Sequence, residues 1–349
     1  MKKYYTRMGD GFGVYLTEEE IRADIRDGVE DAAKRGKIPP LTEEEMDHLF
    51  GIITMDGIIV GVRHGDQVVS STDQGADTIA AECGIPIDRI LQTQIYERGY
   101  GMDSTDYGFT DYNYKAVKSI VSYEAASIEK ALEGSIIPML YGGMPNLGFY
   151  TKPDGPVDNW AELLPLGKIK EAMKAQEEAV EHAVRDIVYV AGMMDEAGVD
   201  GIDLDTCGAA GDADFLAALL ACEQIRKKYP HIGVEIGMAG EFVLGMHGKL
   251  TYDGVKLAGL YPHKQVGLAE KAGCTLFGAV VNTNTTKSFP WNIARVCTFM
   301  KETVQAANIP VHPNVGMGVG GIPMCEVIPG DVVSRADKAL IEICKIDGL

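Results

Sequence analysis

Hydrophobic and polar positions follow two different patterns along the chain, and the change falls near residue 116. From Val117 onward, short apolar runs alternate with longer segments that repeat apolar positions every three to four residues. This alternation is typical of parallel βα units. The strands that it predicts are 118–122, 136–141, 201–205, 232–237, 277–282 and 310–314. We therefore predict an α/β fold, with a TIM-type (β/α)8 barrel over residues 116–349.

Residues 1–115 are predicted to form an N-terminal extension of helices and β segments. Two helix starts are indicated by S/T-x-x-E capping boxes, in which a hydroxyl and a carboxylate bond free backbone N–H groups: Thr17 with Glu20, and Thr42 with Glu45. After the second helix, residues 52–72 are predicted to hold two β runs. A barrel needs ~250 residues, so one large domain with an extension suits this chain.

Polar residues recur in the predicted barrel strands. Side chains alternate in a strand, so Ile202 and Leu204 are expected to face the helices, while Asp203 and Asp205 face inward. The same reasoning adds further inward or strand-terminal residues: Tyr141, Glu235, Asn282, His312 and Asn314. Barrel active sites lie at the C-terminal ends of the strands. We therefore interpret the cluster as a candidate active site, with a buried hydrogen-bond network as the alternative.

A helix-to-strand junction is repeated at the end of the chain. The step Asp200-Gly201-Ile202 leads into a predicted strand, and the step Asp347-Gly348-Leu349 resembles it but ends the sequence. We therefore expect one or more C-terminal barrel strands to be missing from this chain. A barrel without them would have open edges.

The charge and the cysteines restrict the function classes. With 51 acidic and 32 basic residues the net charge is −19, which disfavours nucleic acid and anionic membrane surfaces as partners. The same charge favours a cationic substrate, although acidic surfaces more often serve solubility. Seven cysteines without a CxxC pair suit a reducing compartment, and the sequence shows no signal peptide or membrane span. A cytoplasmic location is predicted.

The generic motifs are weak. Residues 316–321 match GxGxxG, but Ile322-Pro323 follows where a dinucleotide-binding fold needs a helix. Phosphate binding at this or another glycine-rich loop, such as 208–212, is a minor alternative. No HExxH or paired-cysteine spacing supports zinc, and Cys207 is the one candidate thiol nucleophile, more readily interpreted as a buried apolar residue.

Longer segments are more specific. Taken in order, they resemble the dimethylamine:corrinoid methyltransferases of methanogenic archaea along the whole chain: RMGDGFGVYLT (7–17), YGGMPNLGFYTKPDGP (141–156), DTCGAAGDADF (205–215), GMAGEFVLGMHGKLTYDGVKLAGLYPH (237–263), NTNTTK (282–287) and GMGVGGIPM (316–324).

In that family an Asp-Gly-aliphatic step is followed at once by pyrrolysine, which an in-frame amber codon specifies. Here that step is Asp347-Gly348-Leu349, so the resemblance implies pyrrolysine as the residue that follows Leu349. The sequence would then end because amber was taken as a stop. A genuinely shorter homologue is the competing explanation.

The resemblance also implies a reaction. The pyrrolysine imine would bind the amine, and the Co(I) corrinoid of a separate cognate protein would take the methyl group, in methanogenesis from methylamines. This chain would bind no cofactor itself, would assemble as a homo-oligomer and, without pyrrolysine, would be inactive. The expected catalytic acids are Glu235, then Asp205 and Glu241. The expected substrate-binding residues are Tyr141, Asp203, Asn282, His312 and Asn314.

Two alternatives stay open. One is a barrel enzyme that needs no pyrrolysine, either a metal-dependent methyltransferase or a lyase, which stoichiometric zinc or turnover by the 349-residue chain would favour. The other is a non-catalytic fragment that only binds the corrinoid protein, which binding without turnover would favour.

Overall fold

A computed structural model describes residues 2–63, 65–66, 68, 72–73, 108–109, 113–114, 140–245, 249–325 and 327–349. At 72–73, 108–109, 113–114 and 141–144 the description is limited to the backbone. The predicted strand 118–122 and the first part of the strand 136–141 lie outside the described residues.

The chain begins with a hairpin and two helices. Strands β1 (Lys3–Arg7) and β2 (Gly13–Thr17) pair antiparallel, and α1 (Glu18–Gly36) and α2 (Glu43–Ile53) follow. Both helices start at the predicted capping boxes, each with its two reciprocal hydrogen bonds. The β run predicted from residue 52 is wrong in the described part, because Ile52 and Ile53 complete the buried face of α2 and turns follow.

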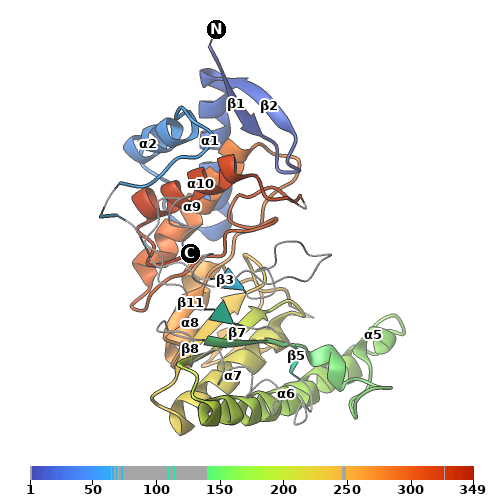
Figure 1. The fold of residues 1–349 in the computed structure, drawn as a ribbon. Helices are drawn as coiled ribbons and strands as arrows, with labels where there is room; N and C mark the ends of the chain where they lie inside the picture. Colours follow the sequence, from blue (N-terminus) through green and yellow to red (C-terminus); the bar gives the residue numbers. More distant parts are fainter. Residues whose placement is uncertain are drawn as a thin grey trace.

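A parallel sheet lies in the lower half of the molecule as drawn in Figure 1. Its strand order is β11-β8-β7-β6-β5, and the bounds are β5 (Asn113–Tyr114), β6 (Leu140–Pro145), β7 (Gly201–Cys207), β8 (Gly233–Met238) and β11 (Leu276–Gly278). Two further pairs are β3 (Thr72–Asp73) with β4 (Gly108–Phe109), which is parallel, and β9 (Thr251–Tyr252) with β10 (Val255–Lys256), which is antiparallel. The strands predicted at 201–205 and 232–237 are confirmed.

The strands predicted at 277–282 and 310–314 form only part of the expected backbone pairing. Residues 277–282 hold the end of β11 and then continue without regular pairing. Residues 310–314 run parallel beside β11, because Phe277 N–H donates to Pro310 O (3.0 Å) and His312 N–H donates to Phe277 O (2.9 Å). The last residues of the chain lie beside residues 310–314, because Asp347 N–H donates to Val311 O (3.2 Å). The described strands establish a parallel α/β fold, whereas a TIM-type barrel that lacks its C-terminal strand, and a domain boundary near residue 115, stay predictions.

Helices connect the strands and cover the sheet (Figure 1). After β6 come η1 (Leu147–Tyr150), α5 (Trp160–Leu163) and the long α6 (Ile169–Ala197), and after β7 comes α7 (Asp212–Lys228). The later elements are α8 (Pro262–Lys271), α9 (Phe289–Ala306), α10 (Gly330–Ala339) and η2 (Leu340–Cys344), a π-helical turn. In the described part, no helix combines the length and apolar character needed to cross a membrane.

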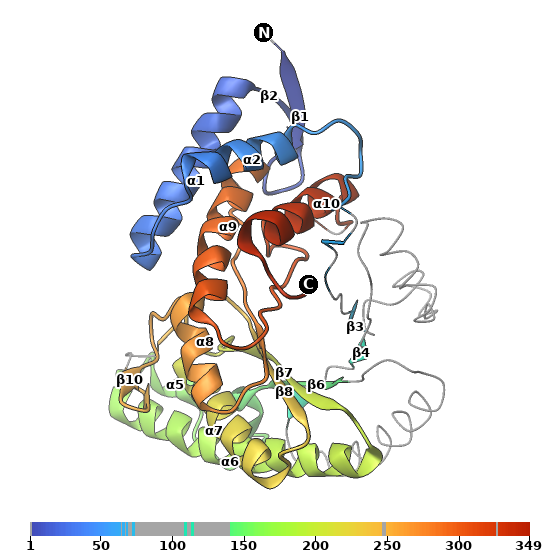
Figure 2. The ribbon, with the colours of Figure 1, turned by 90° about the vertical axis from the view of Figure 1, so that its left-hand side faces the viewer.

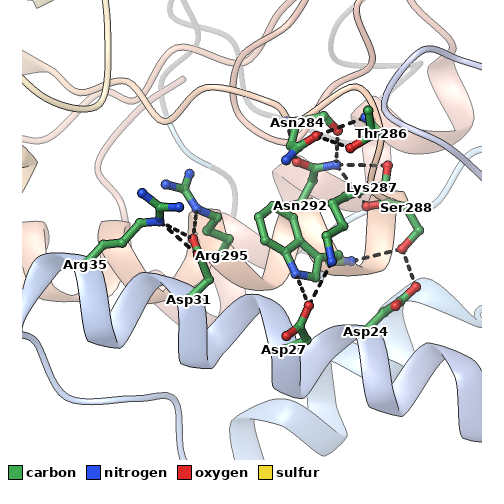
Figure 3. A network of polar contacts seen from close by, with 11 residues as sticks. Asp24, Asp27, Asp31, Arg35, Asn284, Thr286, Lys287, Ser288, Asn292 and Arg295 are labelled. Carbon is green, nitrogen blue, oxygen red and sulfur yellow. Dashed lines mark hydrogen bonds and ion pairs between the residues drawn. The ribbon is translucent and has the colours of Figure 1, made fainter.

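Helix α1 is joined to α9 by a row of polar contacts (Figure 3). Asp24 accepts from Ser288 Oγ at 2.6 Å, and Asp27 accepts from Trp291 Nε1 at 2.7 Å. The two helices approach closely at Gly28, where an added Cβ would lie 2.3 Å from the Trp291 carbonyl oxygen. The N-terminal elements are therefore built onto the helix that precedes residues 310–314.

Helix α10 buries Asp337, which is 4% exposed. Burial raises the pKa of Asp337 to about 8, whereas an unfolded Asp titrates near pH ~3.9. The folded state therefore binds more protons between these values, so stability falls as pH rises, by at most about 1.4 kcal/mol per pH unit.

We expect Asp337→Asn to raise the free energy of unfolding at pH 8 relative to wild type, and to have a much smaller effect at pH 5. Urea unfolding at both pH values measures this. Glu44→Gln on the exposed side of α2 serves as the control. An equal effect at both pH values would show that the carboxyl group of Asp337 is already ionised in the folded protein.

Candidate active site

Two predicted carboxylates lie side by side in the sheet. Asp203 of β7 and Glu235 of β8 are register partners, and they are 2% and 5% exposed. His312 joins them from residues 310–314, with its Nδ1 atom 3.7 Å from Glu235 Oε1. Three residues from three neighbouring parallel segments thus gather near the middle of the sheet.

Glycines leave the space that these carboxylates occupy. A Cβ added to Gly237 would lie 2.8 Å from Asp205 Oδ1, and one added to Gly278 would lie 3.2 Å from Glu235 Oε1. Asp205 is half-buried, and its Oδ1 atom accepts from the backbone N–H of Thr206 at 2.6 Å. Asp205 therefore belongs to the same cluster as Glu235, one step nearer the ends of the strands.

The imidazole of His312 is neutral at ordinary pH. Burial lowers its pKa to about 4, and hydrogen bonds to the backbone of Leu349 and of His312 itself offset part of this effect. Its contact with Glu235 is therefore not an ion pair, despite the short distance. The hydrogen bond to Leu349 places the last described residue of the chain against the site, and Figure 2 shows this end between α10 and the sheet.

Glu241 and Asn282 form a second group with Arg295 of α9. Both Glu241 oxygens accept from Arg295, from Nη1 and from Nη2, at 2.5 Å each, and Arg295 Nε donates to Asp31 at 2.7 Å. Asn282 Oδ1 accepts from the backbone N–H of Glu241 at 3.1 Å. These contacts hold the loop after β8 to α9 and α1, so the structure assigns Glu241 and Asn282 to this ion-pair network.

For the remaining predicted residues, Asn314 and Tyr141, the structure describes backbone contacts. Asn314 is exposed, and its backbone N–H donates to Ala279 O at 2.9 Å. The backbone of Tyr141 pairs with Ile202, while its side chain lies outside the described part. Sequence reasoning missed Arg295, whose signal is a lone arginine in the apolar run 289–300.

The minor alternatives lose support in the loop after β7. The backbone N–H of Gly208 donates to Asp214 Oδ2 at 2.9 Å, so a carboxylate of the chain itself takes the place that a phosphate would need. Burial raises the pKa of the Cys207 thiol well above its usual value, which suits a packed side chain and not a nucleophile.

Within the described ranges, no group of three or more His, Cys, Asp or Glu side chains could hold a metal ion.

A parallel sheet whose adjacent strands carry acidic residues beside a neutral imidazole defines an α/β protein with a buried polar cluster in its sheet. The family model described as dimethylamine methyltransferase matches residues 2–349. The chain belongs to this family and is therefore of the methyltransferase class.

Solved structures with some likeness to the chain include three enzymes. The YdjI aldolase from Escherichia coli K12 has 10% identity and a TM-score of 0.34 over 80% of this chain and 79% of that one. D-Psicose 3-epimerase with D-tagatose from Clostridium cellulolyticum H10 has 10% identity and a TM-score of 0.34, and the match covers 80% of this chain and 99% of that one. The spore cortex-lytic enzyme SleL from Bacillus megaterium QM B1551 has 9% identity and a TM-score of 0.34, and the match covers 88% of this chain and 65% of that one. At these TM-scores the likeness assigns neither fold nor activity.

Proposed function

We propose that the protein transfers a methyl group from dimethylamine to the Co(I) corrinoid of a cognate corrinoid protein, in methanogenesis from methylamines, and that pyrrolysine follows Leu349 in the native chain. Membership of the dimethylamine methyltransferase family supports the reaction class. The observation that carries the rest is the position of Leu349: its backbone is hydrogen-bonded to His312, whose ring lies 3.7 Å from Glu235. A side chain on the next residue would start near the His312 ring, which lies between Leu349 and this carboxylate.

The residues present suit a cationic substrate. Asp203, Asp205 and Glu235 place carboxylates along adjacent strands, and an amine that is protonated at neutral pH would be attracted to them. The neutral ring of His312 adds no opposing positive charge. Burial of Asp203 and Glu235 also keeps bulk water away from the position of the substrate, which strengthens these interactions.

Glu235 is the proposed acid–base group. Its Oε1 atom faces His312 Nδ1, and the proton that the amine loses or regains would be held on this carboxylate. Asp205 is the second candidate for that role, and Asp203 and His312 position the substrate. Glu241 and Asn282 act through the loop that they hold, and Tyr141 and Asn314 stay proposed contacts. Pyrrolysine would supply the electrophilic imine carbon, and the corrinoid of the partner would supply the accepting cobalt.

The proposal includes the location of the enzyme in the cell, its oligomeric state and its partners. The seven cysteines without a CxxC pair support a cytoplasmic location. Assembly as a homo-oligomer is proposed from the family resemblance. No nucleic acid or membrane partner is proposed, since the net charge is −19.

The intact mass of the protein from its source organism tests the pyrrolysine step. We expect a mass above 37.7 kDa, with pyrrolysine after Leu349 in peptides that cross this position. A native mass of 37.7 kDa would overturn the mechanism.

Activity assays separate the alternatives. We expect the longer chain to methylate the corrinoid protein and the 349-residue chain to be inactive. Turnover by the 349-residue chain would favour the pyrrolysine-free enzyme. Binding to the corrinoid protein without turnover by either chain would favour the non-catalytic fragment.

A further inference from the structure

A trough of about 490 Å³ runs along strand β1 and shares no residue with the candidate active site. One wall is the strand itself, since every residue from Lys2 to Arg7 lines the trough. The other wall is the end of α2 at Ile53 with the turn 54–58, and Phe289 and Val332 contribute apolar surface. The volume lies within the range of ~300–1,000 Å³ that is usual for ligand sites.

The wall formed by β1 is an open sheet edge. Strand β1 pairs with β2 on one side, and the two form a sheet of their own. In the described part of the chain, no backbone hydrogen bond joins Lys3–Arg7 to any segment other than β2. An open edge with free N–H and C=O groups accepts an added strand.

The opposite wall is held in place by Arg335. Its guanidinium donates to the carbonyl oxygens of Met55 (2.6 Å), Gly57 (2.8 Å) and Ile58 (3.0 Å). The turn is therefore tied to α10, and the trough is formed before any partner arrives. A preformed site loses less conformational entropy on binding.

The charges of the trough differ from those of the whole chain. Its cations are Lys2, Lys3, Arg7 and Arg335, against the carboxylates of Asp56 and Asp331, in a protein of net charge −19. Arg7 is paired with Asp331 at 3.0 Å, while Lys2 and Lys3 are exposed residues of the lining. Acidic side chains on an incoming strand would complement these two lysines.

The same charges disfavour a second copy of this chain as the occupant. Antiparallel pairing of two β1 strands about Tyr5 would set Lys3 opposite Arg7 of the other copy. Like charges directly opposite each other destabilise a strand pair. We propose that the trough along β1 is a docking site for an extended, acidic segment of a different protein, which adds to β1 as a third strand.

Fluorescence anisotropy tests this with a labelled hexapeptide of alternating Glu and Val. We expect it to bind, and Lys2→Glu/Lys3→Glu to weaken binding at least tenfold. The control Lys168→Glu/Lys170→Glu changes the net charge by the same amount at two exposed positions, one just before α6 and one in its first turn. It should change the affinity for the peptide less than twofold.

Backbone pairing is tested with two further peptides, N-methylated at odd or at even positions. One of the two should lose binding, since one set of amides faces β1 in any strand pair. Absence of binding, or equal binding of all three acidic peptides, would overturn the proposal. Dimerisation that sedimentation detects and that Thr6→Pro in β1 abolishes would also overturn it, in favour of a second copy as the occupant.

Discussion

Glu235→Gln in the chain with the proposed pyrrolysine is expected to lower the kcat of methyl transfer by about 10²- to 10⁴-fold, the usual contribution of a general acid–base group. Glutamine keeps the shape of the buried side chain beside His312 but cannot take up or release a proton at Oε1. Initial rates with dimethylamine and the corrinoid protein, both saturating, measure this change.

The control is Glu177→Gln, at an exposed position of α6, which should leave kcat within a factor of two. A kcat for Glu235→Gln within threefold of wild type would remove Glu235 from the acid–base role and leave Asp205 as the next candidate. Circular dichroism of both variants shows whether the fold is retained.

Glu241→Gln is expected to lower the free energy of unfolding by about 3 kcal/mol, as the loss of one partner from a buried ion pair does. Arg295 is 5% exposed, and both Glu241 oxygens accept hydrogen bonds from it. Among the described residues, the substitution leaves Asp31 as the remaining carboxylate partner of this buried guanidinium. Urea unfolding measures the change.

The double variant Glu241→Gln/Arg295→Met should recover most of that loss, because the unpaired charge is removed together with its partner. A loss below about 1 kcal/mol in the single variant would mean that water or a relaxed side chain compensates Arg295. If Glu241→Gln also lowers kcat without lowering stability, Glu241 returns as a candidate acid.

Local rules in the sequence predicted several features correctly. The pairs Thr17 with Glu20 and Thr42 with Glu45 mark helix starts, because capping depends on residues three positions apart. The alternation in 201–205 and 232–237 places Asp203 and Glu235 on one face of the sheet, because neighbouring side chains of a strand point in opposite directions.

Local rules missed contacts between distant parts of the chain. Glu241 follows a strand as a catalytic carboxylate would, yet its carboxylate binds Arg295, 54 positions further along the chain. Asn282 ends a predicted strand, yet its side chain bonds the backbone of Glu241. Residues 52 and 53 look like the start of a β run, yet the packing of α2 takes them into a helix.

By itself, the sequence determined the alternation of strands and helices, the helix starts, the shared sheet face of Asp203 and Glu235, and the family resemblance. These depend on periodicity, on caps and on long motifs, which are all properties of neighbouring residues. Only the tertiary structure decided that His312 meets Glu235 beside Leu349, that Glu241 is held by Arg295, and that β1 keeps an open edge. Those facts depend on contacts between segments far apart in the chain, and such contacts form only when the helices and strands pack.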